Sequence, residues 1–176
     1  MLLSSSEIRE LVNQGKLVQD MLDESVQIQQ AGVDLTAAKV FTFVGEGVLD
    51  FSNEKRKLPQ YKEIPSQKSQ GDVVWRLEPG TYHIAFNEKI ILPNNIAALL
   101  VPRSSALVCG IVQHSALWDP GYEGRSFFHV DVSRNVVIHK NARLAQIIFF
   151  RVGEGATSYN GRYKNEDILQ KNRSEQ

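Results

Sequence analysis

Short strand-like segments fill the second half of this 176-residue chain and constrain its fold more than any other feature. From residue 81 onward, TYHIAFNEKIILP, IAALLV, RSFFHVDV and VVIHK alternate with Pro, Asn and Gly at short intervals. This spacing is typical of an antiparallel sandwich or barrel, and it contains no helix–strand alternation of the Rossmann kind. We therefore expect a mainly β protein.

The first half of the chain predicts a short helix followed by strands. Ser4 is followed three residues later by Glu7, the pattern of a capping box, and apolar residues at helical spacing continue until Gly15. A second helical stretch is possible within residues 18–30. The polar segment 53–70 carries three consecutive basic residues and two prolines, which favours an exposed loop over an insertion close to a ligand.

Composition indicates one domain over residues 1–176 and excludes several function classes. A length of 176 residues with a hydrophobic content of 42% is enough for one core but few for two. The 20 basic and 20 acidic side chains cancel, which disfavours nucleic acid as a partner. The single cysteine, Cys109, fits a reducing compartment and is ordinarily a small buried residue. The short apolar start and the absence of an apolar run of about 20 residues favour a cytoplasmic protein that does not enter membranes.

A basic and hydroxyl-rich block follows the apolar run 96–101. Arg103, Ser104 and Ser105 place one guanidinium and two hydroxyls where a strand gives way to a turn or a helix. Guanidinium groups and hydroxyls suit phosphate oxygens, so we expect a phosphate contact here, although a surface loop would have the same composition.

Two further blocks combine polar groups with strand-like runs. Asp119 precedes Pro120 and Gly121, so its carboxylate would be held at a tight corner, where it could orient water or a sugar hydroxyl; an ordinary turn is the alternative. Arg143 and Gln146 interrupt an apolar run, which indicates a ligand or a subunit interface. The chain has no Walker-type glycine loop and no Cys/His set with zinc spacing.

In their order, the blocks AGVDL, PRSSALVCG, ALWDPGYEG and ARLAQIIF resemble the four motifs of the superfamily of trimeric dUTPases and dCTP deaminases. The third block is most similar to the deaminases and to archaeal-type dUTPases. The resemblance implies a distorted β-barrel or jelly roll (a β-clip), assembled as a homotrimer whose active sites collect motifs from more than one subunit.

Two departures from the deaminase pattern bear on the reaction. His129 stands where the deaminases carry the glutamate that acts as general acid and base on cytosine, and Val108 stands where they supply a further arginine. Hydrolysis of a phosphoanhydride needs neither group, because it depends on clamping of the phosphates, a metal ion and a positioned water. The resemblance therefore implies a dUTPase.

The resemblance also implies roles for individual residues. Asp119 would meet the deoxyribose and activate the attacking water, Arg103 with its two serines would hold the triphosphate, and Gln146 would add a polar contact. Asp34, in AGVDL, would anchor a hydrated Mg²⁺ ion as a hard oxygen ligand. An aspartate that holds a turn is the alternative for Asp34.

Base recognition is expected on the strand formed by residues 126–130. In this superfamily main-chain groups of that strand distinguish uracil from cytosine, and Phe127 and His129 are its candidate substrate-binding side chains. A structural role in the core is the alternative for the histidine.

The C-terminal segment 153–176 lacks the glycine-rich motif of the common trimeric dUTPases and reads SYNGRYKNED instead. It resembles the lid of dCTP deaminases and archaeal-type dUTPases; a basic, solvated tail is the alternative. The candidate phosphate contacts in this lid are Tyr159, Arg162, Tyr163 and Lys164.

These observations predict Mg²⁺-dependent hydrolysis of the small-molecule substrate dUTP to dUMP and pyrophosphate. Two alternatives stay open at this point. The first is a dCTP deaminase, with or without dUTP hydrolysis as a second activity, in which His129 or another group replaces the glutamate. The second is a non-catalytic regulator that binds dUTP on the same fold.

Overall fold

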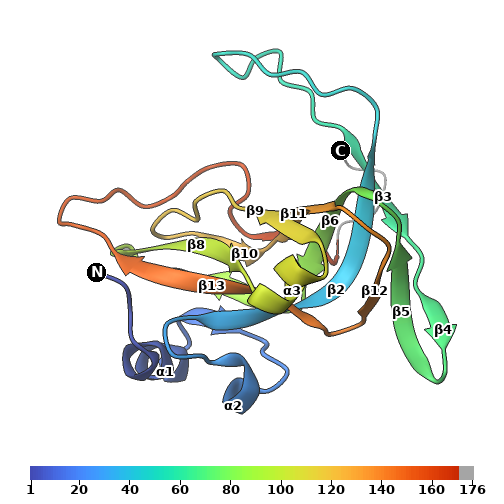
Figure 1. Cartoon of the computed structure of the whole chain (residues 1–176). Coiled ribbons are helices and arrows are strands. Elements are labelled where there is room, and N and C mark those ends of the chain that lie inside the picture. The colour runs from blue at the N-terminus through green and yellow to red at the C-terminus, as the bar shows by residue number, and fades with distance from the viewer. Residues whose placement is uncertain (171–176) are drawn as a thin grey trace.

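Antiparallel strands dominate residues 1–170, the part of the chain that the computed structural model describes (Figure 1). Within it the helices are α1 (Ser5–Asn13), α2 (Glu24–Gln27) and α3 (Ser104–Val108). The strands are β1 (Leu17–Gln19), β2 (Val33–Val44), β3 (Gln60–Ile64), β4 (Gln67–Ser69), β5 (Asp72–Leu77), β6 (Gly80–Phe86), β7 (Lys89–Ile91), β8 (Ile96–Pro102), β9 (Ile111–His114), β10 (Glu123–Arg125), β11 (Phe127–Val132), β12 (Val136–His139), β13 (Arg143–Arg151) and β14 (Glu166–Asp167). The expectation of a mainly β fold is confirmed.

The largest sheet nearly closes into a barrel. Its strands follow the order β8-β13-β2-β6-β11-β9, with β3 added beside β2. The segment after β9 returns to the edge of β8. There Trp118 exchanges two backbone hydrogen bonds with Ala98, and the Ser115 hydroxyl accepts from the Leu100 amide. These bonds cover edges that would otherwise be left open to pair with another chain.

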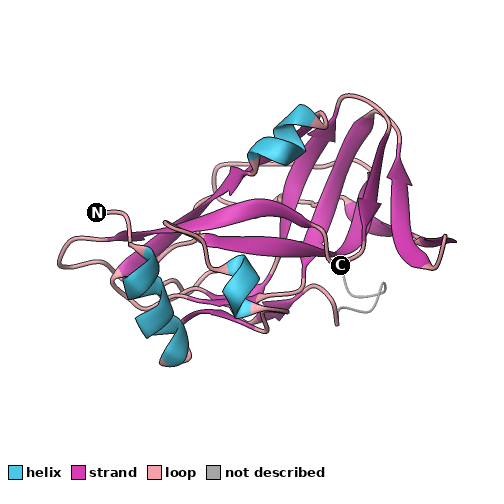
Figure 2. Cartoon of the chain, turned by 60° about the horizontal axis from the view of Figure 1, so that its bottom comes forward, coloured by secondary structure: helices cyan, strands magenta, loops and turns pink. Residues whose placement is uncertain are grey.

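Two smaller sheets flank the barrel (Figure 2). One has the order β1-β7-β10-β14, and in it the tail strand β14 runs parallel to β10; the other has the order β12-β5-β4. Helices α1 and α2 lie near one another, whereas α3 lies apart from both. The tail is therefore fixed to the body by strand pairing as well as by side chains.

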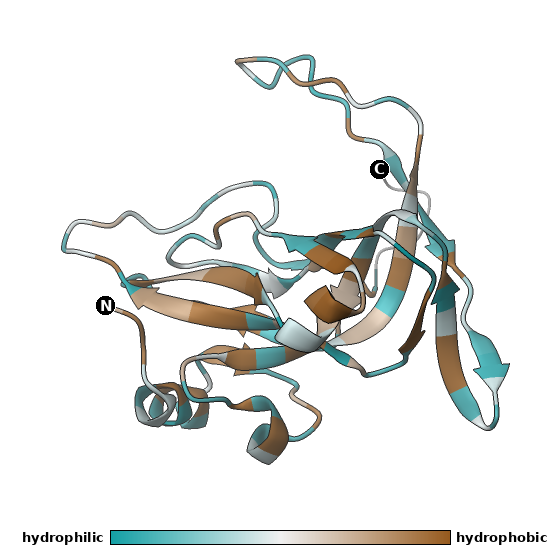
Figure 3. Ribbon diagram, viewed as in Figure 1, coloured by the Kyte–Doolittle hydropathy of each residue, from teal (hydrophilic) through white to brown (hydrophobic). Residues whose placement is uncertain are grey.

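The alternating hydropathy of the strands produces one main core (Figure 3). Leu35, Ile84, Phe86 and Phe149 are fully buried, and each large apolar side chain stabilises the fold by about 1.5–3 kcal/mol. Leu107 and Val108 of α3 are instead exposed, by 46% and 79%. These two side chains therefore add apolar surface outside the core.

The N-terminal expectation is confirmed in detail. Helix α1 begins after Ser4, whose side chain and backbone form the capping box with Glu7, and it ends before Gly15. The backbone of Ser4 and the guanidinium of Arg151 hold the pKa of Glu7 at about 2, well below its ordinary value. Helix α2 lies within the 18–30 stretch but is only four residues long.

Other expectations need correction. Segment 53–70 is not one loop, because it contains β3 and β4, while the exposed connection 45–59 projects from the body as an arm (Figure 1). Cys109 is exposed rather than buried, since it follows α3 on the outer surface. In the described part of the chain, the helices are all too short to span a bilayer.

Candidate active site

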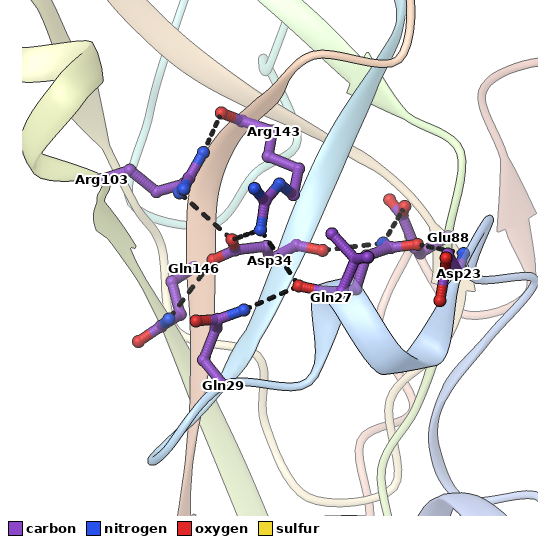
Figure 4. Close-up of polar contacts among 9 residues, drawn as sticks. Asp23, Gln27, Gln29, Asp34, Glu88, Arg103, Arg143 and Gln146 are labelled. Carbon is purple, nitrogen blue, oxygen red and sulfur yellow. Dashed lines mark hydrogen bonds and ion pairs between the residues drawn. The ribbon is translucent and has the colours of Figure 1, made fainter.

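A buried carboxylate organises the polar end of the barrel (Figure 4). Asp34 on β2 is 1% exposed, and its Oδ2 atom accepts from Arg103 Nε and Arg143 Nη1, each at 3.1 Å. The Gln146 amide donates to the other oxygen, Oδ1, at 3.3 Å. Sequence reasoning pointed to all four residues separately, and the structure brings them together.

A β-bulge explains how two residues of β13 reach the same carboxylate. Arg143 and Gln146 are three positions apart, so in a regular strand their side chains would point to opposite faces. The register of β13 against β2 shifts between Arg143 and Ala145, and this shift turns both side chains toward Asp34. Gly32 permits the close approach, since a Cβ there would lie 2.5 Å from the Ile147 carbonyl oxygen.

Arg103, Ser104 and Gln146 line a small cavity of about 210 Å³ together with Val101 and Pro102. The Arg103 guanidinium also donates from Nη1 to the Arg143 carbonyl oxygen at 2.9 Å, so it is held at both ends. Ser105 is exposed on α3 and does not line this cavity. The arrangement offers a fixed guanidinium and one hydroxyl to an anion.

The surroundings of Asp34 do not fit a Mg²⁺ ion. Its carboxylate already pairs with two guanidinium groups, and the described residues contain no cluster of three His, Cys, Asp or Glu that would hold a metal. Mg²⁺ requires near-octahedral oxygen ligands, and two adjacent cations oppose its entry. The expectation that Asp34 anchors the metal therefore finds no support in this geometry, which makes Asp34 a partner for the two arginines.

A second network lies behind Asp34 and holds β2 in place. Glu88 is completely buried and accepts from Thr36 N at 3.0 Å, from the Thr36 hydroxyl at 2.5 Å and from Gln27 Nε2 at 2.7 Å. The pKa of Glu88 lies above its ordinary value, because the effect of burial outweighs the opposite effect of these hydrogen bonds. Gln27 also donates to the Asp34 carbonyl oxygen at 2.8 Å, so the network reaches the backbone of Asp34 itself.

A larger cavity of about 300 Å³ lies around Asp119. The Tyr122 amide donates to the Asp119 carbonyl oxygen at 3.1 Å, and Gly121 has φ +78°, so residues 119–122 form the expected turn. Within residues 1–170 the Asp119 carboxylate has no side-chain hydrogen bond or ion pair, and it is partly exposed to the cavity. It is available to accept a proton or a hydroxyl.

The remaining wall of the Asp119 cavity is aromatic and rich in histidine. Phe127 and His129 line it, as sequence reasoning proposed for substrate-binding residues. Sequence reasoning missed several other residues, because their positions depend on strand pairing and on the path of the tail. These are His83, His114, Trp118, Tyr122 and Glu166.

The tail docks on its own chain beside this cavity. The Tyr159 amide donates to the Pro120 carbonyl oxygen at 2.7 Å, and the Tyr159 ring lies 5.7 Å from that of Tyr122. Ile168 is buried against Phe41 and Ala85, and Arg125 pairs with Asp167 at 2.9 Å. The described part of the predicted lid is therefore held to the body of the protein near Tyr159 and near Ile168.

The four tail candidates have different surroundings. Tyr159 and Tyr163 line the Asp119 cavity, whereas Arg162 joins Arg56 and Lys57 of the arm in a separate cavity of about 250 Å³. Lys164 is exposed. The last six residues of the predicted tail, 171–176, lie outside the described residues.

Comparison with known proteins gives the family. The family model described as dCTP deaminase-like matches residues 2–152. The chain belongs to the dCTP deaminase-like family. Among curated members, it is 45% identical over 152 residues to a deoxyuridine 5'-triphosphate nucleotidohydrolase of Methanocaldococcus jannaschii, with 86% of this chain and 96% of that protein covered. It is 38% identical over 168 residues to a probable enzyme of the same name from Archaeoglobus fulgidus, with 94% and 97% covered.

The fold is likewise that of the dCTP deaminase-like family. A crystal structure of 2'-deoxycytidine 5'-triphosphate deaminase from Agrobacterium tumefaciens matches with a TM-score of 0.64 at 22% identity. The match covers 86% of this chain and 48% of the deaminase. The expected resemblance to the superfamily and its barrel-like fold is confirmed.

Proposed function

We propose that the protein is a dUTP diphosphatase that hydrolyses dUTP to dUMP and pyrophosphate. The observation that carries the proposal is the Asp119 cavity. It joins a carboxylate that has no side-chain partner within residues 1–170 to an aromatic wall in which His129 replaces the acid of the deaminases. The names of the archaeal relatives support the same reaction.

The chemistry requires a base for water and a clamp for the phosphates. Asp119 accepts a proton from a water molecule, whose oxygen attacks the α-phosphorus while the bond to the β-phosphate bridging oxygen breaks. Pyrophosphate leaves with the electron pair of that bond. Arg103 and Ser104 stabilise the charge on the phosphates, and the Arg103 guanidinium is already held in position before the substrate arrives.

The two halves of this machinery line different cavities of one chain. Arg103 and Ser104 share no cavity-lining residue with Asp119. We propose a homotrimer in which Arg103 of one copy meets Asp119 of another, so that one nucleotide contacts both. The exposed apolar residues Leu107 and Val108, next to Arg103 in sequence, support an interface at this place.

Magnesium enters this proposal as part of the substrate. The chain offers no cluster of ligands for a resident ion among its described residues, so the triphosphate oxygens would hold Mg²⁺ in the Mg·dUTP complex. The exposed thiol of Cys109 fits the reducing cytoplasm in which such an enzyme would work.

The tail acts as a lid in the same proposal. Tyr159 and Tyr163 already line the Asp119 cavity, and Arg162 and Lys164 lie on the same segment to meet the terminal phosphates. Segments that order over a ligand commonly close the site to bulk solvent, which leaves the positioned water as the nucleophile.

A dCTP deaminase is the second candidate, and one observation favours it. Glu166 brings a second carboxylate into the Asp119 cavity, from the tail rather than from β11. A deaminase would need this group, or His129, to shuttle protons on the cytosine ring.

The deciding experiment incubates purified protein and Mg²⁺ with dUTP or with dCTP, following nucleotides by chromatography and ammonia in parallel. We expect dUMP and pyrophosphate from dUTP and no ammonia from dCTP. Release of ammonia that disappears in Glu166→Gln would establish the deaminase instead. Binding of dUTP without any product would establish a non-catalytic regulator.

Replacement of the base tests the assignment of Asp119. Asp119→Asn should lower kcat by roughly 100-fold to 10,000-fold, since general base catalysis contributes about that much, while dUTP binding changes little. Asp50→Asn on the arm is the matched control and should retain full activity. An unchanged kcat in Asp119→Asn would overturn its role.

A further inference from the structure

Three histidines form a row across adjacent strands beside the Asp119 cavity. His129 on β11 lies directly opposite His83 on β6 and opposite His114 on β9. All three line the cavity, and the reaction proposed above uses none of them. Their contacts fix which ring nitrogens carry protons.

His83 is the buried member of the row. Its ring lies 4.1 Å from the rings of both Phe43 and Phe127, and its Nε2 atom lies 2.9 Å from His129 Nδ1. Burial, followed by the nearby His129, lowers the pKa of His83 from 6.5 to about 3. His83 is therefore neutral near pH 7, with one protonated ring nitrogen.

The proton of His83 belongs on Nε2. The other nitrogen, Nδ1, is buried and has no hydrogen-bond partner among residues 1–170. A buried N–H without an acceptor costs free energy comparable to a lost hydrogen bond and is rarer than an under-used acceptor. With the proton on Nε2, His83 donates to Nδ1 of His129.

His129 must then carry its own proton on Nε2. Its Nδ1 accepts from His83, and a neutral imidazole has one donor and one acceptor. Nε2 lies 3.9 Å from Asp131 Oδ1, too far for a hydrogen bond. The Thr81 hydroxyl and His114 already hold Asp131, each at 2.8 Å. The Nε2–H of His129, on a side chain 38% exposed, thus remains free for a ligand.

We propose that His129 reads the base of the bound nucleotide as a fixed hydrogen-bond donor, and that His83 sets this polarity. This proposal rests on the proposed function, and it identifies the residue that selects uracil over cytosine. Uracil has a keto oxygen at position 4, which accepts a hydrogen bond from Nε2–H. Cytosine has an amino group there, so two hydrogen-bond donors would face each other.

A change of tautomer cannot readily rescue cytosine. If His129 accepted from the amino group through Nε2, its proton would move to Nδ1, and His83 would have to accept there. The proton of His83 would then lie on its buried Nδ1, which has no acceptor in the described structure. The site therefore penalises the amino base twice.

The tautomers can be measured directly in the wild-type protein. In long-range ¹H–¹⁵N NMR spectra of ¹⁵N-histidine-labelled protein at pH 7.5, we expect His83 and His129 both as Nε2–H forms. His83→Phe keeps an aromatic ring in the slot but removes the donor, so His129 should become a mixture of tautomers. An Nδ1–H form of His129 in the wild type would overturn the proposal.

Binding measures the consequence for specificity. Calorimetric titration with the α,β-imido analogues of dUTP and dCTP gives a ratio of dissociation constants, and we expect it to shrink by roughly tenfold or more in His129→Gln and in His83→Phe. An amide offers both donor and acceptor, so glutamine loses the discrimination. His139→Gln, an exposed histidine outside the cavity, should leave the ratio unchanged.

The two proposals fail in different ways. Absence of dUTP hydrolysis with a normal preference for the uracil analogue would remove the diphosphatase and keep the reading of the base by His129. Normal dUTP hydrolysis, with an unchanged ratio of dissociation constants in both variants, would contradict the specificity role of His129 and leave the diphosphatase assignment standing. If His83→Phe does not fold, His129→Gln and the wild-type spectrum decide.

Discussion

The Arg103 cavity and the Asp119 cavity hold their polar groups in place by opposite means. In the Arg103 cavity, ion pairs hold the polar groups in place. A buried carboxylate pairs with two guanidinium groups, so the cluster carries one net positive charge. Around Asp119, aromatic rings and histidines form much of the wall beside the carboxylates of Asp119 and Glu166, and the buried His83 stays neutral.

This difference matches two kinds of recognition. Phosphate oxygens carry charge and resemble one another, so a fixed, net-positive clamp suits them. Bases differ in the direction of their hydrogen bonds, so a donor of fixed direction, such as one held by a neutral histidine, distinguishes them. Substitutions in the two cavities should therefore change stability and binding in different ways.

The largest effect is expected when the charge of Asp34 is removed. Asp34→Asn leaves two guanidinium groups facing each other without an anion, and breaking such a pair costs about 3 kcal/mol or more. We expect this loss in the free energy of unfolding, measured in urea, together with weaker binding of the triphosphate. Asp72→Asn is the control, because that aspartate forms an exposed pair with His139, and it should change stability by under about 1 kcal/mol.

The metal hypothesis makes a different prediction for the same variant. If Asp34 held Mg²⁺, the ion would stabilise the substrate-free wild-type protein and not Asp34→Asn. We expect thermal unfolding of both proteins to be insensitive to EDTA and to millimolar Mg²⁺. Stabilisation of the wild type alone by Mg²⁺ would restore the metal role.

A smaller effect should appear at His83, in the Asp119 cavity, as the pH falls. The pKa of His83 is lowered to about 3 in the folded protein, so below pH 6.5 the unfolded chain binds a proton that the folded chain does not. Stability is then lost on acidification, by up to roughly 1.4 kcal/mol per pH unit and by about 1.6 kcal/mol between pH 6.5 and 5. The difference between wild type and His83→Phe isolates this contribution.

The expected sign is specific. Relative to the wild type, His83→Phe should gain stability as the pH falls through this window, and at neutral pH the two should differ little. A constant difference across the window would mean that His83 titrates alike in both states.

Strand periodicity and motif order predicted much of the molecule. The short alternating segments indicate antiparallel strands, and the Asp-Pro-Gly corner indicates the turn at Asp119, because both depend on neighbouring residues alone. The capping box at Ser4 is local in the same way. These features are present in the structure as expected.

Features that depend on long-range pairing were not predictable. The bulge that turns Arg143 and Gln146 to one side requires knowledge of the register between β13 and β2. The contact of His83 with His129 requires the pairing of β6 with β11, across 46 positions of sequence. The two guanidinium groups beside Asp34 were unpredictable for the same reason, since a motif shows the carboxylate but not the cations around it.

The smallest effect should distinguish the charged and uncharged partners of Asp34. Gln146 donates to Asp34 through one 3.3 Å bond, and Gln146→Met keeps the length of the side chain while removing the amide. Because the two guanidinium groups still satisfy the carboxylate, we expect stability to fall by under about 1 kcal/mol. The KM for dUTP should nevertheless rise if the amide also meets the phosphates, since Gln146 lines the Arg103 cavity. A stability loss as large as that of Asp34→Asn would mean that the amide, and not the ion pairs, holds the clamp together.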